Sequence, residues 1–254
     1  MNSPLTIIQI TDLHILAEQG KTMSGVDTEQ SFKQLLKHIH SEHKKIDLLL
    51  VTGDLAEDPC EASYQRIFQA LNKYPTRTAC LPGNHDNFSL MQQFISGQQI
   101  NCDKHLQFKH WQVINLNSKK TGSQGGYLAA SELNFLTDTL KNNKPLNTLI
   151  AVHHHPVATH SRWMDTMMIE NSAELLSLIK DYPQVKAITC GHIHQELQTI
   201  KEGKLIFGTP SSCFQFKPLS SEYAIDNNQT GAGYRVFSLD SEGQIETKVY
   251  RPNN

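Results

Sequence analysis

Short apolar segments of this sequence end repeatedly in motifs that combine glycine with aspartate, asparagine or histidine. In chain order, the motifs are Asp12-Leu13-His14, Gly53-Asp54, Gly83-Asn84-His85-Asp86, His153-His154-His155 and Gly191-His192-Ile193-His194. Each motif closely follows a short, mostly apolar run, as expected where a buried strand ends. Because the carboxyl ends of strands gather along one edge of an open α/β sheet, we expect these polar groups to meet at one site.

The rest of the pattern predicts a layered α/β fold. Continuous apolar runs predict strands over residues 5–10, 46–51, 78–81, 111–116, 148–152 and 185–190. Helical spacing of apolar residues predicts amphipathic helices around residues 32–39, 64–71, 133–140 and 175–179, with Asp27 or Thr28, Ser131 and Ser172 as N-caps. After residue 204 this spacing stops, and residues 204–207, 234–239 and 244–250 predict C-terminal antiparallel strands. No linker or internal repeat interrupts the chain, so we expect a single domain over residues 1–254.

Composition argues against several classes of partner. The 254 residues include 23 Lys and Arg against 25 Asp and Glu, so no basic excess is present to bind nucleic acid. The five cysteines contain no CxxC pair, which favours reduced thiols over a disulfide framework. Residues Met1 to Pro4 show no signal-peptide pattern, and no segment has the apolar length of a membrane helix. We therefore expect a cytoplasmic protein that binds neither nucleic acid nor membrane.

The motifs supply oxygen and nitrogen donors suited to metal ions. Asp12 and His14 are two residues apart, so an extended segment would turn both side chains to the same side, and His192 and His194 share this spacing. Glycine at positions 53, 83 and 191 would allow a sharp turn at each strand end. Carboxylate, amide and imidazole groups without thiolate favour manganese, iron or zinc over calcium or a structural zinc site.

The set and order of the motifs resemble the calcineurin-like metallophosphoesterase superfamily, over about residues 5–217. Further stretches are similar to the bacterial cyclic-AMP phosphodiesterases, the class III cyclic nucleotide phosphodiesterases. The most specific of these stretches are Gln195-Glu196-Leu197 and Phe214-Gln215-Phe216, which the general metal chemistry does not require. The resemblance implies a four-layer α/β/β/α sandwich with C-terminal antiparallel strands.

The resemblance also implies a pair of divalent metal ions, iron or manganese and sometimes zinc. One ion would be held by Asp12, His14, Asp54 and His194, and the other by Asp54, Asn84, His153 and His192. Asp54 would bridge the two ions. His153, the first residue after its strand, is preferred to His154 as the ligand. His85 would lie beside the phosphate without binding metal. His14, Asp54 and His85 are therefore the expected catalytic residues, and the expected substrate contacts are His14, Asp54, Asn84, His85, His153 and His194.

The implied reaction is hydrolysis of 3′,5′-cyclic AMP to 5′-AMP by in-line attack of a metal-bridging hydroxide. The same site could instead serve a phosphomonoester, a glycerophosphodiester or a 2′,3′-cyclic nucleotide, and a non-catalytic metal-binding scaffold is a third alternative. Trp163 would either contact a base or pack under its loop, and Gln215 would either face the substrate or pack. A small-molecule cyclic nucleotide is the expected partner, with a homodimer as a further expectation.

Overall fold

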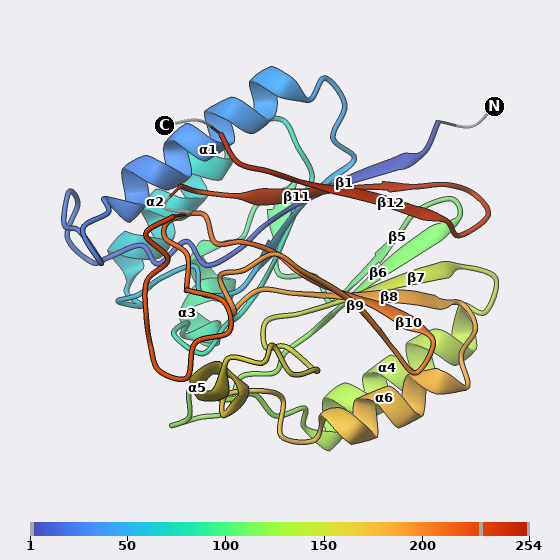
Figure 1. Cartoon of the computed structure of the whole chain (residues 1–254). Helices are drawn as coiled ribbons and strands as arrows, with labels where there is room; N and C mark the ends of the chain where they lie inside the picture. The colour runs from blue at the N-terminus through green and yellow to red at the C-terminus, as the bar shows by residue number, and fades with distance from the viewer. Residues whose placement is uncertain (1–2, 229–230, 253–254) are drawn as a thin grey trace.

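Two six-stranded mixed sheets form the centre of the molecule in this computed structural model, which describes residues 3–228 and 231–252 (Figure 1). The outermost residues of the expected 1–254 domain, including Met1, lie outside the described residues. The first sheet has the order β12 (Ile245–Tyr250), β11 (Tyr234–Leu239), β1 (Leu5–Ile10), β2 (Leu48–Thr52), β3 (Thr78–Leu81) and β4 (Ile100–Asn101). The second has the order β5 (His105–Gln107), β6 (Trp111–Leu116), β7 (Asn147–Val152), β8 (Val185–Cys190), β10 (Lys204–Gly208) and β9 (Leu197–Lys201).

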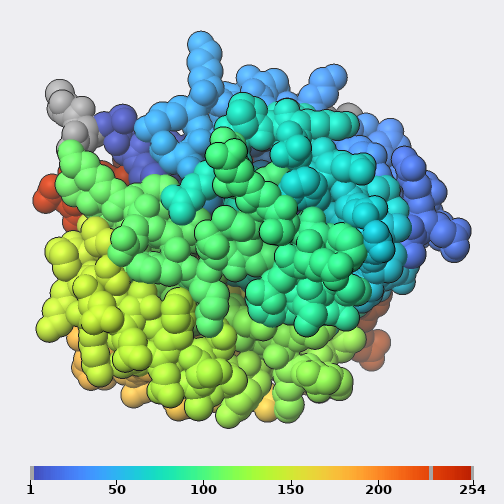
Figure 2. Space-filling view, turned by 180° about the vertical axis from the view of Figure 1, so that it is seen from behind, coloured from blue at the N-terminus to red at the C-terminus, as the bar shows by residue number. Residues whose placement is uncertain are grey.

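Helices cover the outer face of each sheet. Helices α1 (Thr28–Glu42), α2 (Glu61–Leu71) and α3 (Phe88–Phe94) belong to the first half of the chain, and α4 (Ala130–Asn142), α5 (Arg162–Asp165) and α6 (Ser172–Lys180) to the second. In Figure 1, α1 and α2 lie against the first sheet, and α4 and α6 against the second. Seen from behind, cyan to green segments form much of the surface, and the red C-terminal strands appear only at its margins (Figure 2).

Alternation of side chains along the strands produces three hydrophobic layers. In β1, Ile7 packs between the sheets, whereas Ile8 and Ile10 pack toward the helices. In β2, Leu48 and Leu50 likewise face the second sheet. Both faces of these strands are buried, which explains their nearly continuous apolar sequence. The expected α/β/β/α sandwich is therefore confirmed.

The predicted strand bounds agree with the structure to within two residues at each end, and the C-terminal strands β11 and β12 are antiparallel as expected. Asp27 is the N-cap of α1, because its carboxylate accepts a 2.9 Å hydrogen bond from the backbone N–H of Gln30. The predicted cap at Ser131 is wrong, because α4 begins at Ala130 and its N-cap is Ala129. Ser172 is likewise the first residue of α6 rather than its cap.

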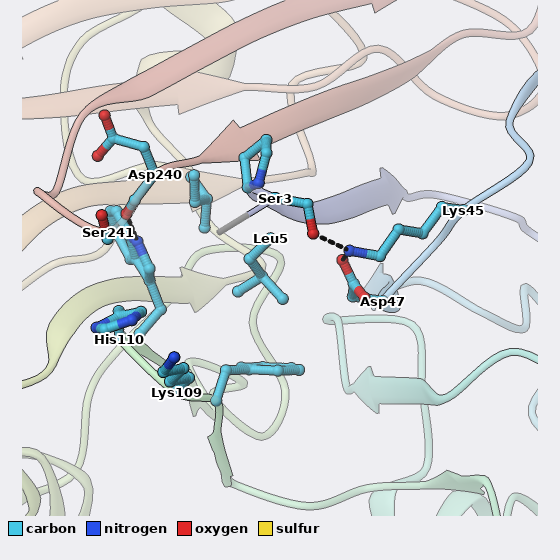
Figure 3. A pocket seen from close by; sticks show the side chains of 12 residues that line it. Ser3, Leu5, Lys45, Asp47, Lys109, His110, Asp240 and Ser241 are labelled. Carbon is cyan, nitrogen blue, oxygen red and sulfur yellow. Dashed lines mark hydrogen bonds and ion pairs between the residues drawn. The ribbon is translucent and has the colours of Figure 1, made fainter. Parts of the chain in front are cut away.

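A hollow of about 300 Å³ lies where β1 and β6 begin and β11 ends, so it is at the opposite end of the strands from the motifs. Trp111, Phe108 and Leu5 give it an apolar wall, and Lys45 bonds Ser3 and Asp47 at its rim (Figure 3). None of the strand-end motif residues lines it. Separately, in the part of the chain that the structure describes, no helix has both the length and the apolar character needed to cross a bilayer.

Candidate metal centre

All seven expected metal ligands lie together where the parallel strands end. Overlapping groups place ligand atoms of Asp12, His14 and His194, and of Asp12, Asp54 and His153, within 4.8 Å of one another. Asn84 joins the second group through its carbonyl oxygen, which is 3.0 Å from Nε2 of His153. Strands from both sheets supply these residues, so the packing of one sheet on the other assembles the site.

Five of these residues adopt the left-handed backbone conformation. Their φ angles are 55° for Asp12, 48° for His14, 49° for Asp54, 67° for His192 and 46° for His194. The expectation that Asp12-Leu13-His14 and His192-Ile193-His194 are extended is therefore wrong. For residues with a side chain this conformation is disfavoured by roughly 1–2 kcal/mol each, so the surrounding structure must hold them there.

The glycines of the motifs have two different functions. Gly53 does adopt a positive φ of 92°, as expected for a turn. Gly83 and Gly191 instead allow close packing, because a Cβ atom would lie 2.1 Å from Oδ1 of Asp54 in the first case and 2.0 Å from Oγ1 of Thr11 in the second. At Gly83 and Gly191 the loops of the site therefore lie closer to their neighbours than a residue with a side chain would permit.

The first group of donors converges on one point. Nε2 of His14 lies 3.3 Å from Nε2 of His194, and Oδ1 of Asp12 lies 3.4 Å from Nε2 of His194. Nε2 of His14 is 3.9 Å from both Oδ1 of Asp12 and Oδ2 of Asp54. Metal–ligand bonds of about 2.0–2.2 Å place tetrahedral ligands roughly 3.3–3.6 Å apart, so the two shorter separations fit a shared ion and the two of 3.9 Å are slightly wider.

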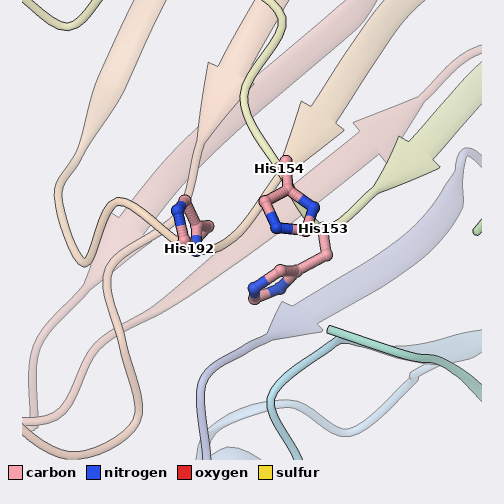
Figure 4. Close-up of side chains that lie close together, drawn as sticks. All are labelled: His153, His154 and His192. Carbon is pink, nitrogen blue, oxygen red and sulfur yellow. The ribbon is translucent and has the colours of Figure 1, made fainter. Parts of the chain in front are cut away.

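The second group surrounds His153 and His192. Nε2 of His153 is 3.1 Å from Oδ2 of Asp54. The rings of His153 and His192 lie edge to face with centroids 5.0 Å apart (Figure 4). Nε2 of His192 is buried and has no hydrogen-bond partner among the described residues. A buried nitrogen with no partner is unfavourable in isolation, and a metal ion would satisfy it.

Outer contacts orient the histidine rings toward the cluster. Nδ1 of His14 donates to Oε2 of Glu57 at 2.8 Å, Nδ1 of His153 to the carbonyl of Thr52 at 2.9 Å, and Nδ1 of His194 to the carbonyl of Phe214 at 2.8 Å. This arrangement is typical of metal-bound histidine, because it fixes the tautomer that leaves Nε2 free to bind. The donor set therefore fits a pair of metal ions.

His153 and His154 differ in what their ring nitrogens contact. Both nitrogens of His154 have partners: Nδ1 is 2.7 Å from the hydroxyl of Ser118, and Nε2 donates to the carbonyl of Gln124 at 3.1 Å. Nε2 of His153 instead faces Asp54 and Asn84. His154 still lies close to His153 and His192, but its hydrogen bonds favour His153 as the ligand.

The buried carboxylates of the cluster are ionised. Burial opposes the charge of Asp54, but His153 and other nearby imidazoles outweigh it and hold the pKa of Asp54 well below its usual range. Burial likewise opposes the charge of Asp12, but His194 outweighs it and lowers the pKa of Asp12. Two ionised carboxylates at one buried point favour the binding of cations.

Glu57 contacts two residues of the site, and the motifs did not reveal it. Its Oε2 accepts from Nδ1 of His14 and also lies 3.0 Å from Nδ1 of His85. Burial opposes its charge, but the hydrogen bonds from the two histidines lower the pKa of Glu57 to about 2. Burial alone would lower the pKa of His85, whereas Glu57 and Asp54 raise it to about 9. Glu57 lies three residues after Asp54, and this spacing in a strand-end loop was the available signal.

Two further residues hold the loops and side chains of the expected ligands in place. The buried Asp86 accepts hydrogen bonds from the backbone N–H groups of Leu55, Ala56 and Gly83, and so ties two of the motif loops together. Gln124 accepts a 2.5 Å hydrogen bond from the amide nitrogen of Asn84. That bond fixes the Asn84 amide with its oxygen toward His153. Gln124 lies in no motif, and nothing in its sequence neighbourhood pointed to this contact.

A cavity of about 210 Å³ opens beside the cluster. Its lining includes His14, Asp54, Asn84, His85 and His194, which are five of the six expected substrate contacts. The sixth, His153, is fully buried beneath them. Gln215 does not face this cavity, because its amide bonds the backbone of Ser211 and Gly231. The packing alternative for Gln215 is therefore the correct one.

Comparison with known proteins agrees with this geometry. The family model described as calcineurin-like phosphoesterase matches residues 5–196. This chain belongs to that family.

Individual relatives cover nearly the whole chain. It is 38% identical over 248 residues to a 3′,5′-cyclic-nucleotide phosphodiesterase of Nostoc sp., covering 98% of this chain and 92% of that protein. It is 34% identical to the 3′,5′-cyclic adenosine monophosphate phosphodiesterase CpdA of Escherichia coli over 96% of this chain and 89% of that protein. A dimetal phosphatase from Danio rerio has the same fold, with a TM-score of 0.67 and 13% identity over 98% of this chain and 96% of that one.

Proposed function

We propose that this protein hydrolyses 3′,5′-cyclic AMP to 5′-AMP at a binuclear metal site. The observation that carries the proposal is the convergence of the seven expected ligands beside a cavity, in a chain whose relatives over nearly the full length are named as cyclic nucleotide phosphodiesterases. Asp12, His14, Asp54 and His194 would hold one ion, and Asp54, Asn84, His153 and His192 the other. Asp54 is suited to bridge them, because its Oδ2 lies 3.1 Å from His153 and 3.9 Å from His14.

Two divalent ions, iron or manganese, would lower the pKa of an attacking water and neutralise charge on the phosphoryl oxygens. The amino acids of the chain supply the rest of the reaction. In-line attack forms a new phosphorus–oxygen bond and breaks the bond to the 3′ oxygen, which leaves as an alkoxide unless it receives a proton. His85 lines the cavity, and its Nδ1 is engaged by Glu57, so its Nε2 is the group available to donate that proton.

Glu57 is placed to act on both halves of this chemistry. Through His14 it orients a metal ligand, and through His85 it favours the protonated form that a proton donor needs. His14 and His85 lie edge to face with ring centroids 5.1 Å apart, so a single carboxylate fixes both rings. A cytoplasmic location, a homodimer and a single domain over the whole chain stay predictions from the sequence.

The experiment is release of 5′-AMP from 3′,5′-cyclic AMP by the metal-reconstituted protein, beside Asp54→Ala and a panel of other phosphoesters. We expect rapid hydrolysis of cyclic AMP by the wild type and none by Asp54→Ala. Cleavage of a phosphomonoester, a glycerophosphodiester or a 2′,3′-cyclic nucleotide in place of cyclic AMP would keep the metal chemistry and overturn the substrate. A metal-loaded wild type that cleaves nothing would overturn both.

A further inference from the structure

The cavity beside the metal cluster has two chemically different parts. One part is lined by the histidine, aspartate and asparagine side chains of the cluster. The other is lined by aromatic rings and thioethers, from residues Met23, Trp163, Met164, Met167, Phe216 and Tyr223. The phosphoryl chemistry requires nothing of this second part, so its apolar character calls for a separate explanation.

Trp163, Phe216 and Tyr223 form an aromatic triad at this end of the cavity. Their ring centroids are 5.0 Å apart for Trp163 and Phe216, 5.3 Å for Trp163 and Tyr223, and 5.4 Å for Phe216 and Tyr223. All three pairs meet edge to face, at 84°, 74° and 67°. In each edge-to-face pair the edge of one ring covers one face of the other, so the three contacts cover at most half of the six ring faces and leave the rest to a planar ligand.

The triad is joined directly to the metal cluster. The ring of Phe216 stacks on that of His194 at 4.1 Å and 19°, so one face of Phe216 is occupied by an expected metal ligand. Trp163 and Tyr223 lie beyond Phe216 and supply the remaining aromatic surface. A ligand whose phosphate sits at the cluster would therefore place its next bulky group against these two rings.

Hydrogen bonds hold the triad in position. The carboxylate of Asp165 accepts from the backbone N–H and the hydroxyl of Thr159 and from the N–H of His160, which fixes the short helix α5 that carries Trp163. The backbone N–H of Lys217 donates to the carbonyl of Ala224 at 2.8 Å, which holds the segment of Tyr223 beside Phe216. Tyr223 is nevertheless 57% exposed, so more than half of its surface is not used in packing the loop.

We propose that Trp163, Phe216 and Tyr223 bind the purine base of the nucleotide by stacking. This inference rests on the proposed function, since it assumes a nucleotide substrate. Three polar groups of the lining lie outside the cluster: the amide of Gln124, which is already bonded to Asn84, the hydroxyl of Tyr223, and the indole N–H of Trp163, which is buried without a partner among the described residues. The last two groups can bond the ring nitrogens N3 and N7, which adenine and guanine share, so the base is recognised by its planar shape rather than by the edge that distinguishes the two purines. Sites of this kind discriminate weakly, so adenine and guanine nucleotides should bind within about tenfold of each other.

The test compares 5′-AMP with ribose 5-phosphate, which differ only by the base. Both are measured as inhibitors of bis(p-nitrophenyl) phosphate hydrolysis by the metal-loaded protein. We expect 5′-AMP to inhibit at least about tenfold more tightly, because stacking of one base on an aromatic side chain contributes an effect of this order. Tyr223→Ala and Trp163→Ala should each reduce this ratio toward one without changing inhibition by ribose 5-phosphate. Tyr127→Ala, which changes an exposed tyrosine outside the cavity lining, is the matched control and should keep the wild-type ratio.

Fluorescence gives a direct measurement of binding. The chain has two tryptophans, and Trp111 lies buried at the other end of the strands. We expect 5′-AMP to quench the emission of the wild type and to leave that of Trp163→Phe unchanged. Equal inhibition by 5′-AMP and ribose 5-phosphate in the wild type would overturn the stacking site. A preference for 5′-AMP over 5′-GMP of a hundredfold or more would overturn recognition by shape. Failure to hydrolyse cyclic AMP, with the inhibitor ratio intact, would overturn the proposed function alone.

Discussion

The contact of Glu57 with both His14 and His85 leads to a prediction about leaving groups. If His85 protonates the departing 3′ oxygen, its importance depends on how much that oxygen needs a proton. The alkoxide released from cyclic AMP is a poor leaving group, whereas p-nitrophenolate leaves without one. His85→Asn should therefore impair hydrolysis of cyclic AMP far more than that of bis(p-nitrophenyl) phosphate.

The expected size of the effect follows from the role of the proton donor. General acid catalysis contributes about 10²–10⁴-fold to a rate, or roughly 2.7–5.4 kcal/mol in activation free energy. We expect His85→Asn to lower kcat for cyclic AMP within this range and kcat for bis(p-nitrophenyl) phosphate by about tenfold or less. Glu57→Gln removes the charge that holds His85 and should lower kcat for cyclic AMP by about 10–100-fold.

Combining the substitutions separates the two roles of Glu57. If Glu57 acts on the proton donor through His85, the double variant should be slower on cyclic AMP than His85→Asn only by the factor that Glu57→Gln loses with bis(p-nitrophenyl) phosphate. Any loss that Glu57→Gln shows with bis(p-nitrophenyl) phosphate then reports the contact with His14, and metal content measured on the same samples should fall with it. Glu61→Gln, at the exposed start of α2, is the control. Equal losses on both substrates for His85→Asn would refute the assignment of His85 as proton donor.

Three further predictions concern stability. Gly191→Ala should lower the free energy of unfolding, measured by urea titration, by more than about 3 kcal/mol, because the new Cβ would lie 2.0 Å from Oγ1 of Thr11. The control is Gly125→Ala, whose Cβ would have its nearest neighbour at 3.4 Å and should change the free energy of unfolding by less than about 1 kcal/mol. Arg235→Ala should lower the free energy of unfolding by about 3–5 kcal/mol, because the buried guanidinium donates to the carbonyls of Leu197 and Gly208 and fills the space between the sheets. A loss no larger than that caused by Arg162→Ala, which changes an exposed arginine, would contradict this. Burial lowers the pKa of His43 in the folded protein, so folding disfavours its protonated form and stability is lost as pH falls below the unfolded value of about 6.5. His43→Gln should show a weaker decline in melting temperature over that window, and an unchanged profile would show that other groups control it.

Much of the layered fold was predictable from the sequence, because strands buried on both faces must be apolar throughout. The bounds of β1, β3, β6, β8 and β11 agree with the prediction at both ends. Strand β9 was missed, because it is a mostly exposed edge strand with the mixed sequence LQTIK. The cap of α4 was placed wrongly at Ser131, since a serine near a helix start is a common signal but Ala129 occupies the cap position without any side-chain bond.

The site was predictable to the extent that its residues immediately follow strands. A residue one to four positions after a strand end stays near the sheet edge, whatever the loop does next. Glu57, Gln124 and Trp163 reach the site by longer routes through loops, and their positions depend on tertiary contacts such as those of Asp86 and Asp165. Sequence spacing says little about such contacts: Glu57 had only its position three residues after Asp54 as a signal, and Gln124 had none.

The left-handed backbone of the candidate ligands shows how the pattern of alternate residues pointed to side chains that do lie together, although the expected geometry was wrong. An extended Asp12-Leu13-His14 would continue β1 and direct both side chains along one face of the sheet. The positive φ angles at Asp12 and His14 instead fold the segment back, and the backbone N–H groups of both residues donate to the carbonyls of Gly53 and Asp54. Those bonds bring the loop after β1 onto the loop after β2, so that Asp54 reaches both groups of donors. Left-handed residues at Asp54, His192 and His194 contribute corresponding turns from the neighbouring strands. These strained turns therefore allow one carboxylate, that of Asp54, to lie between the two groups of donors.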